Sequence, residues 1–71
     1  MSRKEYLSQN IRKLRKKHKL SQEKVAKKVG ITYSTLAKLE SGANKNPTLD
    51  TLWKIADSFE VSLDYLVGRS R

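Results

Sequence analysis

Apolar residues recur every three or four positions along the chain, the spacing that places side chains on one face of an α-helix. Five such stripes can be distinguished, and no segment alternates for long enough to predict a β-strand. Their members are Leu7, Ile11 and Leu14; Val25, Ala26 and Val29; Leu36 and Leu39; Leu49, Leu52, Ile55, Ala56 and Phe59; and Leu63 and Leu66. We therefore predict an all-α fold of five short helices, with these residues on the inner faces.

Residues that begin and end helices lie at the edges of these stripes. The expected N-terminal features are a capping box at Ser2 and Glu5 and N-caps at Ser21, Thr32 and Ser62. Gly30, Gly42 and Gly68 are expected to end helices. The first helix has no such glycine, so it should run to about His18 and turn at Lys19. The fourth helix can begin at Thr48, or at Asn46 followed by Pro47.

The second and third helices are separated only by residues 30–32. So short a link forces a large angle between two helices, as in a helix-turn-helix. Ala26 is small enough for the helices to cross closely, and Ile31, Leu36 and Leu39 anchor the third helix from beneath.

With Leu36 and Leu39 buried, the opposite flank of the third helix faces outward. That flank carries Ser34, Ala37, Lys38 and Ser41, with Thr32 and Tyr33 at its leading end. Such a face can enter the major groove of DNA, where Lys38 can donate to guanine or to a phosphate and Ala37 leaves room for a thymine methyl group. The alternative is that each of these is an ordinary solvated surface residue.

The charge is strongly positive and unevenly distributed. The chain of 71 residues has a formal net charge of +9. Residues 1–45 hold 13 Lys or Arg against 3 acids, whereas residues 46–71 hold 3 against 4. A basic front and a neutral rear favour a polyanionic partner, although a lysine-rich surface can also serve solubility alone.

Several function classes are disfavoured by the composition. So short a chain has little room for an enclosed catalytic cavity, and with no Cys and one His a metal site is not expected. We predict neither enzymatic activity nor a cofactor. Without an apolar run long enough for a membrane span, or a visible signal peptide, we expect a cytoplasmic protein.

The sequence resembles the Cro/C1-type helix-turn-helix family of phage repressors and bacterial regulators. The resemblance rests on residues 20–26 (LSQEKVA), 29–32 (VGIT) and 36–42 (LAKLESG), and extends from residue 11 through 46–49 to 61–68. It implies a compact lambda-repressor-like domain of five helices over residues 1–68, with the second and third forming the helix-turn-helix. Residues 69–71 would be a short basic tail.

The resemblance also implies roles for individual residues. Gln22 matches a glutamine that contacts a DNA phosphate and braces the recognition helix, and Arg15 and Glu40 match a partly buried ion pair. The alternative for that pair is that both residues are separately solvated. Family positions that read bases correspond to Thr32, Tyr33, Ser34 and Lys38, and those that contact the DNA backbone correspond to Ser41, Lys45 and Asn46. We also expect Arg15 and Ser21 to contact phosphates.

Two positions depart from the family pattern. Lys19 stands where many relatives have Gly, which leaves the end of the first helix uncertain. Tyr33 replaces the more usual amide or small residue, which leaves the base preference open.

Aromatic residues in the neutral rear half suggest a protein interface. Trp53 flanks the stripe of the fourth helix, and Tyr65 lies beside Leu66 and Val67 on the fifth. A twofold dimer through these helices would place two recognition helices about one DNA turn apart, ~34 Å. Alternatively, both aromatic residues seal a small core.

We therefore predict a repressor that binds double-stranded DNA sequence-specifically as a homodimer. One alternative is the antitoxin of a toxin–antitoxin pair, whose main partner is a protein. Another is a basic surface for RNA or anionic membranes, but this does not explain why Ser34, Ala37 and Lys38 converge on one helix face.

Overall fold

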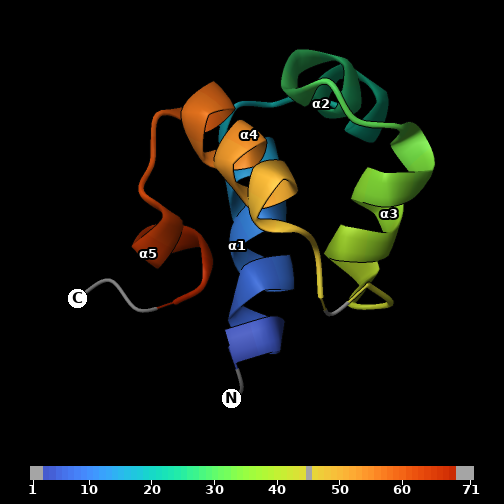
Figure 1. Cartoon of the computed structure of the whole chain (residues 1–71). Helices are drawn as coiled ribbons and strands as arrows, with labels where there is room; N and C mark the ends of the chain where they lie inside the picture. Colours follow the sequence, from blue (N-terminus) through green and yellow to red (C-terminus); the bar gives the residue numbers. More distant parts are fainter. Residues whose placement is uncertain (1–2, 45, 69–71) are drawn as a thin grey trace.

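Five α-helices make up most of the computed structural model, which describes residues 3–44 and 46–68 (Figure 1). They are α1 (Arg3–Lys17), α2 (Gln22–Val29), α3 (Tyr33–Ser41), α4 (Leu49–Phe59) and α5 (Leu63–Leu66). These segments contain no β-strand. The prediction of an all-α fold with five helices is confirmed. The expected capping box at Ser2 and Glu5 and the tail at 69–71 lie outside the described residues and side chains.

Side chains cap the start of α2, α3, α4 and α5 in the same way. The hydroxyl of each N-cap residue accepts a hydrogen bond from the backbone N–H three positions later, which satisfies one of the free donors of the first turn. The N-caps are Ser21, Thr32, Thr48 and Ser62. Thr48 therefore begins α4, and the alternative start at Asn46 and Pro47 is wrong.

Residues in the left-handed region terminate several helices. Gly30 and Gly42 follow α2 and α3 with φ of 86° and 83°. Lys19 makes the predicted turn after α1 with φ of 56°, and α1 itself ends at Lys17. Glu60 closes α4 in the same conformation, with φ of 55°, where no glycine signalled the end. The last helix stops at Leu66 with Val67 as its C-cap, and Gly68 follows in the left-handed region with φ of 78°.

The core lies where α1 passes between α3 and α5, with α4 packed against α2 and α5 (Figure 1). Its members come from all five stripes: Leu7, Ile11, Leu14, Val25, Ala26, Val29, Leu36, Leu39, Ile55, Ala56, Phe59 and Leu66. Leu49 is the exception to the predicted inner faces, because this first residue of α4 is 56% exposed. None of the helices in the described segments is both long and apolar enough to cross a membrane.

Candidate nucleic-acid interface

The link between α2 and α3 turns the chain sharply. The N–H groups of Gly30 and Ile31 both donate to the carbonyl of Ala26, at 2.9 and 3.0 Å, which closes the end of α2. Thr32 then caps α3. The two helices lie at a large angle (Figure 1), and the buried Ala26 allows them to approach closely. This arrangement is a helix-turn-helix.

The exposed flank of α3 presents the side chains expected to read bases. The residues Tyr33, Ser34 and Lys38 are exposed, and their side chains make no hydrogen bond or ion pair with any other described group. Ala37 is half-buried, so it offers less surface than the helical spacing predicted. A tyrosine, a hydroxyl and an ammonium group are therefore available together on one helix flank.

The hydroxyls at the two ends of this flank are already engaged within the protein. Thr32 Oγ1 accepts from the N–H of Thr35 at 3.1 Å and donates to Thr35 Oγ1 at 2.8 Å. Ser41 Oγ donates to the carbonyl of Lys38 and accepts from the N–H of Ala43, both at 3.2 Å. Both hydroxyls therefore help to shape the ends of α3, although both residues are exposed.

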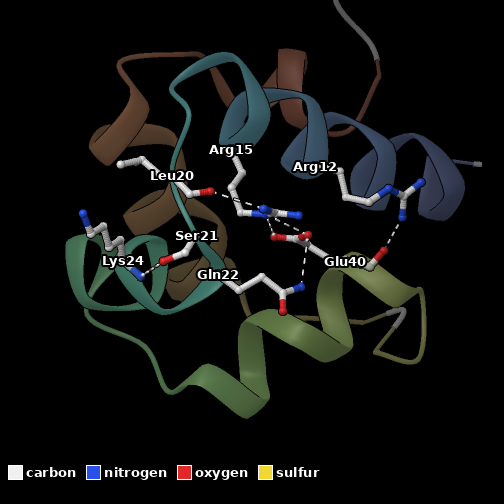
Figure 2. A network of polar contacts seen from close by, with 7 residues as sticks. All are labelled: Arg12, Arg15, Leu20, Ser21, Gln22, Lys24 and Glu40. Atoms are coloured by element: carbon white, nitrogen blue, oxygen red, sulfur yellow. Dashed lines mark hydrogen bonds and ion pairs between the residues drawn. The ribbon is translucent and has the colours of Figure 1, made fainter.

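Glu40 anchors α3 to the two preceding helices (Figure 2). Its carboxylate is only 3% exposed and accepts two hydrogen bonds from Nε of Arg15, at 2.8 and 3.1 Å. Nε2 of Gln22 donates to the same carboxylate at 3.3 Å. Arg15 also donates from Nη1 to the carbonyl of Leu20 at 3.2 Å, so Nε and Nη1 of its guanidinium are both engaged inside the protein. Gln22 therefore braces α3 through Glu40.

A second arginine of α1 reaches the same residue of α3. Nη1 of Arg12 donates to the backbone carbonyl of Glu40 (Figure 2). Arg12 was not among the predicted site residues, and this contact was missed. The three-residue spacing places Arg12 and Arg15 on one face of α1, but it does not identify the backbone carbonyl that Arg12 reaches.

An open hollow lies between the start of α2 and the start of α3. It is lined by Arg15, Ser21, Gln22, Glu23 and Tyr33. Three residues expected to contact phosphates, Arg15, Ser21 and Gln22, are therefore brought together. Tyr33 borders them on the α3 side.

The loop after α3 carries the other expected contacts to the DNA backbone. Ser41 and Asn46 are exposed. The loop is shaped by hydrogen bonds from the N–H of Asn44 to the carbonyl of Lys38, at 3.0 Å, and from the N–H of Asn46 to Oδ1 of Asn44, at 3.1 Å. Lys45 lies outside the described residues.

The remaining charges divide as the sequence suggested. Exposed lysines follow the end of α1 and the outer side of α2: Lys13, Lys16, Lys17, Lys19, Lys24, Lys27 and Lys28. The exposed acids of the rear half lie on or next to α4 and α5: Asp50, Asp57, Glu60 and Asp64. Lys54 pairs with Asp50 at 3.2 Å. The front half of the chain, with α1 and the helix-turn-helix, is therefore the positive part of the molecule.

The rear half carries an exposed apolar surface on α4. Trp53 is 53% exposed and lies four residues after the exposed Leu49, so the two share one flank of the helix. Trp53 borders an open hollow that is also lined by the apolar Ala56, Val61 and Leu63 and by the polar Asp57, Ser62 and Asp64. Trp53 therefore does not seal the core.

The residues of α5 expected at a dimer interface differ in their surroundings. Tyr65 is half-buried and packs against the core, and Val67 is half-buried. Leu66 is fully buried in the core. The assignment of Leu66 to a dimer surface is wrong. On the single turn of α5 its side chain faces the core, whereas that of the neighbouring Tyr65 is only half-buried.

Comparisons with known proteins agree with this geometry. A family model described as Helix-turn-helix matches residues 11–66, which include both helices of the motif and the residues that anchor them. The chain belongs to the Cro/C1-type helix-turn-helix family. The members of this family are DNA-binding transcriptional regulators and not enzymes. No solved structure matched the chain significantly.

Three relatives illustrate the extent of the similarity. An uncharacterized HTH-type transcriptional regulator, YobD of Bacillus subtilis, is 43% identical over 60 residues, which are 84% of this chain and 53% of the relative. The cryptic phage CTXphi transcriptional repressor RstR of Vibrio cholerae is 36% identical over 63 residues, 89% and 55% of the two chains. An uncharacterized HTH-type transcriptional regulator of Archaeoglobus fulgidus is 41% identical over 56 residues, 79% of each. The chain thus spans about half the length of the Bacillus and Vibrio relatives.

Proposed function

We propose that this helix-turn-helix domain binds double-stranded DNA sequence-specifically, with α3 in the major groove, and acts as a homodimeric transcriptional repressor. The observation that carries the proposal is the state of α3. Its inner side is fixed by Leu36, Leu39 and the buried Glu40, while Tyr33, Ser34 and Lys38 are exposed on its outer flank. A rigid helix with free polar groups on one flank suits base recognition.

In this proposal the base edges meet the outer flank of α3. Lys38 donates to guanine O6 or N7, and Ser34 and Tyr33 contribute hydroxyls that can donate or accept. Thr32 and the half-buried Ala37 are the other proposed base-reading residues. Thr32 would contribute mainly through its methyl group, because its hydroxyl is engaged by Thr35.

The proposed phosphate contacts flank α3 at both ends. Gln22, Ser21 and the outer edge of Arg15 line the hollow before α3. Ser41 is the last residue of α3, and Lys45 and Asn46 follow α3 in the sequence. Contacts of this kind position the protein without reading sequence, and the exposed lysines add a salt-dependent attraction.

The homodimer is proposed on the apolar surface of α4. Leu49 and Trp53 expose large apolar side chains beside the hollow lined by Val61 and Leu63, and such a surface is typical of a protein interface. Of the residues predicted at the dimer interface, Trp53 is kept at the centre of the proposed surface, and Tyr65 and Val67 are placed at the edge of that surface. The repressor role is supported by the Vibrio relative RstR, which is described as a transcriptional repressor.

The proposed unit is a DNA-binding domain over residues 1–68, followed by a basic tail at 69–71. Because its proposed ligand is DNA and not a small substrate, no cofactor or catalytic step is assigned to it. Its proposed location is the cytoplasm, where the DNA of a bacterium or phage is transcribed.

Selection of bound sites from a random duplex library tests this function. We expect enrichment of a sequence with two related half-sites, arranged with twofold symmetry and centred about one helical turn apart, ~10 base pairs. Enrichment of a single asymmetric half-site would contradict the homodimer. Failure to enrich any sequence, even at low salt, would contradict sequence-specific binding itself.

A further inference from the structure

We propose that Arg12 is a positioning residue for the recognition helix, acting through the backbone carbonyl of Glu40 and not as a phosphate ligand. This inference rests on the proposed function, because it concerns how α3 is held for DNA binding. It assigns a role to a residue that composition alone places among the basic surface residues.

The backbone carbonyls at the C-terminal end of α3 need hydrogen-bond partners from outside the regular helix. The last four carbonyls of an α-helix have no partner within the helix. Here the carbonyl of Lys38 accepts from the N–H of Asn44 and the hydroxyl of Ser41, and that of Leu39 accepts from the N–H of Gly42 at 3.4 Å. The carbonyl of Glu40 accepts from Arg12.

The second step is electrostatic. The C-terminal end of a helix carries partial negative charge, so a guanidinium there is favourable. Both Arg12 and the contact are partly buried, which reduces competition from water. Arg12 therefore caps α3 from another helix.

The third step is geometric. Arg15 binds the carboxylate of Glu40, and Arg12 binds its backbone carbonyl. Two side chains of α1 therefore contact one residue of α3 at two separate groups (Figure 2). The two arginines are about 4.5 Å apart along the axis of α1. A carboxylate contact reaches α3 only through the rotatable side-chain bonds of Glu40, although Leu36 and Leu39 already pack the helix against the core. The backbone contact fixes the helix itself, and with it the directions of Ser34 and Lys38.

The competing role for Arg12 is a phosphate contact, and the two roles predict different losses. A phosphate ligand contributes equally to all duplexes, and its removal lowers the slope of binding against salt by about one. A positioning residue contributes where the outer flank of α3 must match base edges. Its removal should reduce binding to the selected sequence far more than binding to random duplex, which should fall only as far as the loss of one positive charge at Lys13 lowers it, and should leave the salt slope unchanged.

The experiment compares Arg12→Met, Arg12→Lys and Lys13→Met with the unaltered chain. Methionine keeps most of the apolar stem but removes the donor and the charge. Lys13 is the matched control, because it is the exposed neighbour on the same helix and loses the same charge. Dissociation constants are measured for the selected duplex and for a random duplex between low and moderate salt, and unfolding midpoints verify that each variant is folded.

We expect Arg12→Met to weaken binding to the selected duplex roughly tenfold, the loss typical of one hydrogen bond from a charged donor. Its affinity for random duplex should equal that of Lys13→Met, and its salt slope should equal that of the unaltered chain. Arg12→Lys, which can still donate to the carbonyl, should recover most of the loss. Equal losses on both duplexes, with a slope lower by about one, would overturn the proposal and make Arg12 a phosphate ligand.

A second measurement needs no DNA. If Arg12 holds the end of α3, hydrogen exchange at the amides of Gly42 and Asn44 should be faster in Arg12→Met than in Lys13→Met. Unchanged exchange together with unchanged affinity would refute the positioning role while the proposed function stands. Failure of the unaltered chain to distinguish any duplex would instead refute the proposed function, and the role of Arg12 in DNA binding with it.

Discussion

Glu40 illustrates how one buried charge can organise a small domain. Its carboxylate accepts hydrogen bonds from the guanidinium of Arg15 and from the amide of Gln22, so the buried charge has polar partners. A pair of this kind adds little net stability by itself, but removal of one partner leaves the other charge uncompensated. Its value lies in the fixed relation between α1, α2 and α3.

Glu40→Ala should therefore destabilise the domain. We expect a loss of about 2–4 kcal/mol in the free energy of unfolding. This loss is somewhat smaller than that for breaking a fully buried ion pair, because the Arg15 side chain is 19% exposed. The measurement is urea denaturation followed by circular dichroism. The double variant Arg15→Met with Glu40→Met is the control, since it leaves no charge stranded and should recover much of the loss. A Glu40→Ala variant as stable as the unaltered chain would contradict the bracing role.

Lys38 tests base reading at the same scale. Lys38→Ala should cost ~1–3 kcal/mol of binding free energy on the selected duplex and relax the preference at one base position. Lys54→Ala is the control, because Lys54 pairs with Asp50 on the rear half. The measurement is repeated site selection together with fluorescence anisotropy. A uniform loss across all sequences would instead assign Lys38 to a phosphate.

Some residues of the site could be found from the sequence and others could not. The outward direction of Ser34 and Lys38 follows from helical spacing once Leu36 and Leu39 are placed inside. The contact of Arg12 could not be found in this way, because it joins a side chain to a backbone carbonyl 28 residues away. Every residue has a backbone carbonyl, so the residue types do not indicate which carbonyl accepts a hydrogen bond.

At the scale of elements, the helix starts were the most predictable features. A hydroxyl residue followed by an apolar stripe marks the capped ends at Ser21, Thr32 and Ser62, because capping is a local interaction. The helix ends were less predictable where no glycine occurs. Glu60 adopts a left-handed conformation after α4, and nothing in the residue type signals this.

The stripes themselves misplaced Leu49 for a physical reason. A residue in the first turn of a helix can satisfy the three- and four-residue spacing and still be exposed, because no neighbouring helix extends far enough to cover it. Leu49 therefore belongs to the exposed flank shared with Trp53. The same flank is the proposed dimer surface.

Lys19 provides a prediction for the connection between α1 and α2. It is held at φ of 56°, a conformation that costs a residue with a Cβ atom roughly 1–2 kcal/mol. Lys19→Gly should therefore stabilise the domain by about 1 kcal/mol, somewhat less than the full cost because glycine also makes the unfolded chain more flexible. Thermal unfolding measures the effect. Lys13→Gly, at an exposed position in the interior of α1, is the control and should destabilise. A lower melting temperature for Lys19→Gly would contradict the conformation.

For the whole molecule, the two ends of the charge distribution correspond to two proposed tasks. The basic helices and α3 face DNA, and the acid-rich α4 and α5 carry the exposed apolar surface. The division was visible in the sequence because it follows chain order. The identity of the interface residues was not, since it depends on which side of α5 packs inward.

Trp53→Ser tests the proposed dimer. Because Trp53 is half exposed, the monomer should lose little stability, within about 0.5 kcal/mol. Dimer dissociation should increase at least tenfold, as expected for an aromatic anchor at an interface centre. Sedimentation equilibrium measures this, with Lys54→Ser as the control on the neighbouring position. A dimer that forms equally well without Trp53 would place the interface elsewhere.

The central claim is that the outer flank of α3 meets the duplex. The direct measurement is a nuclear magnetic resonance titration of the protein with its selected duplex. The largest shifts are predicted at Tyr33, Ser34 and Lys38, with smaller ones around Gln22 and Ser41, and Leu49 and Trp53 should not respond to duplex beyond any effect of dimer formation. Shifts centred on α4, with α3 unaffected, would contradict the account.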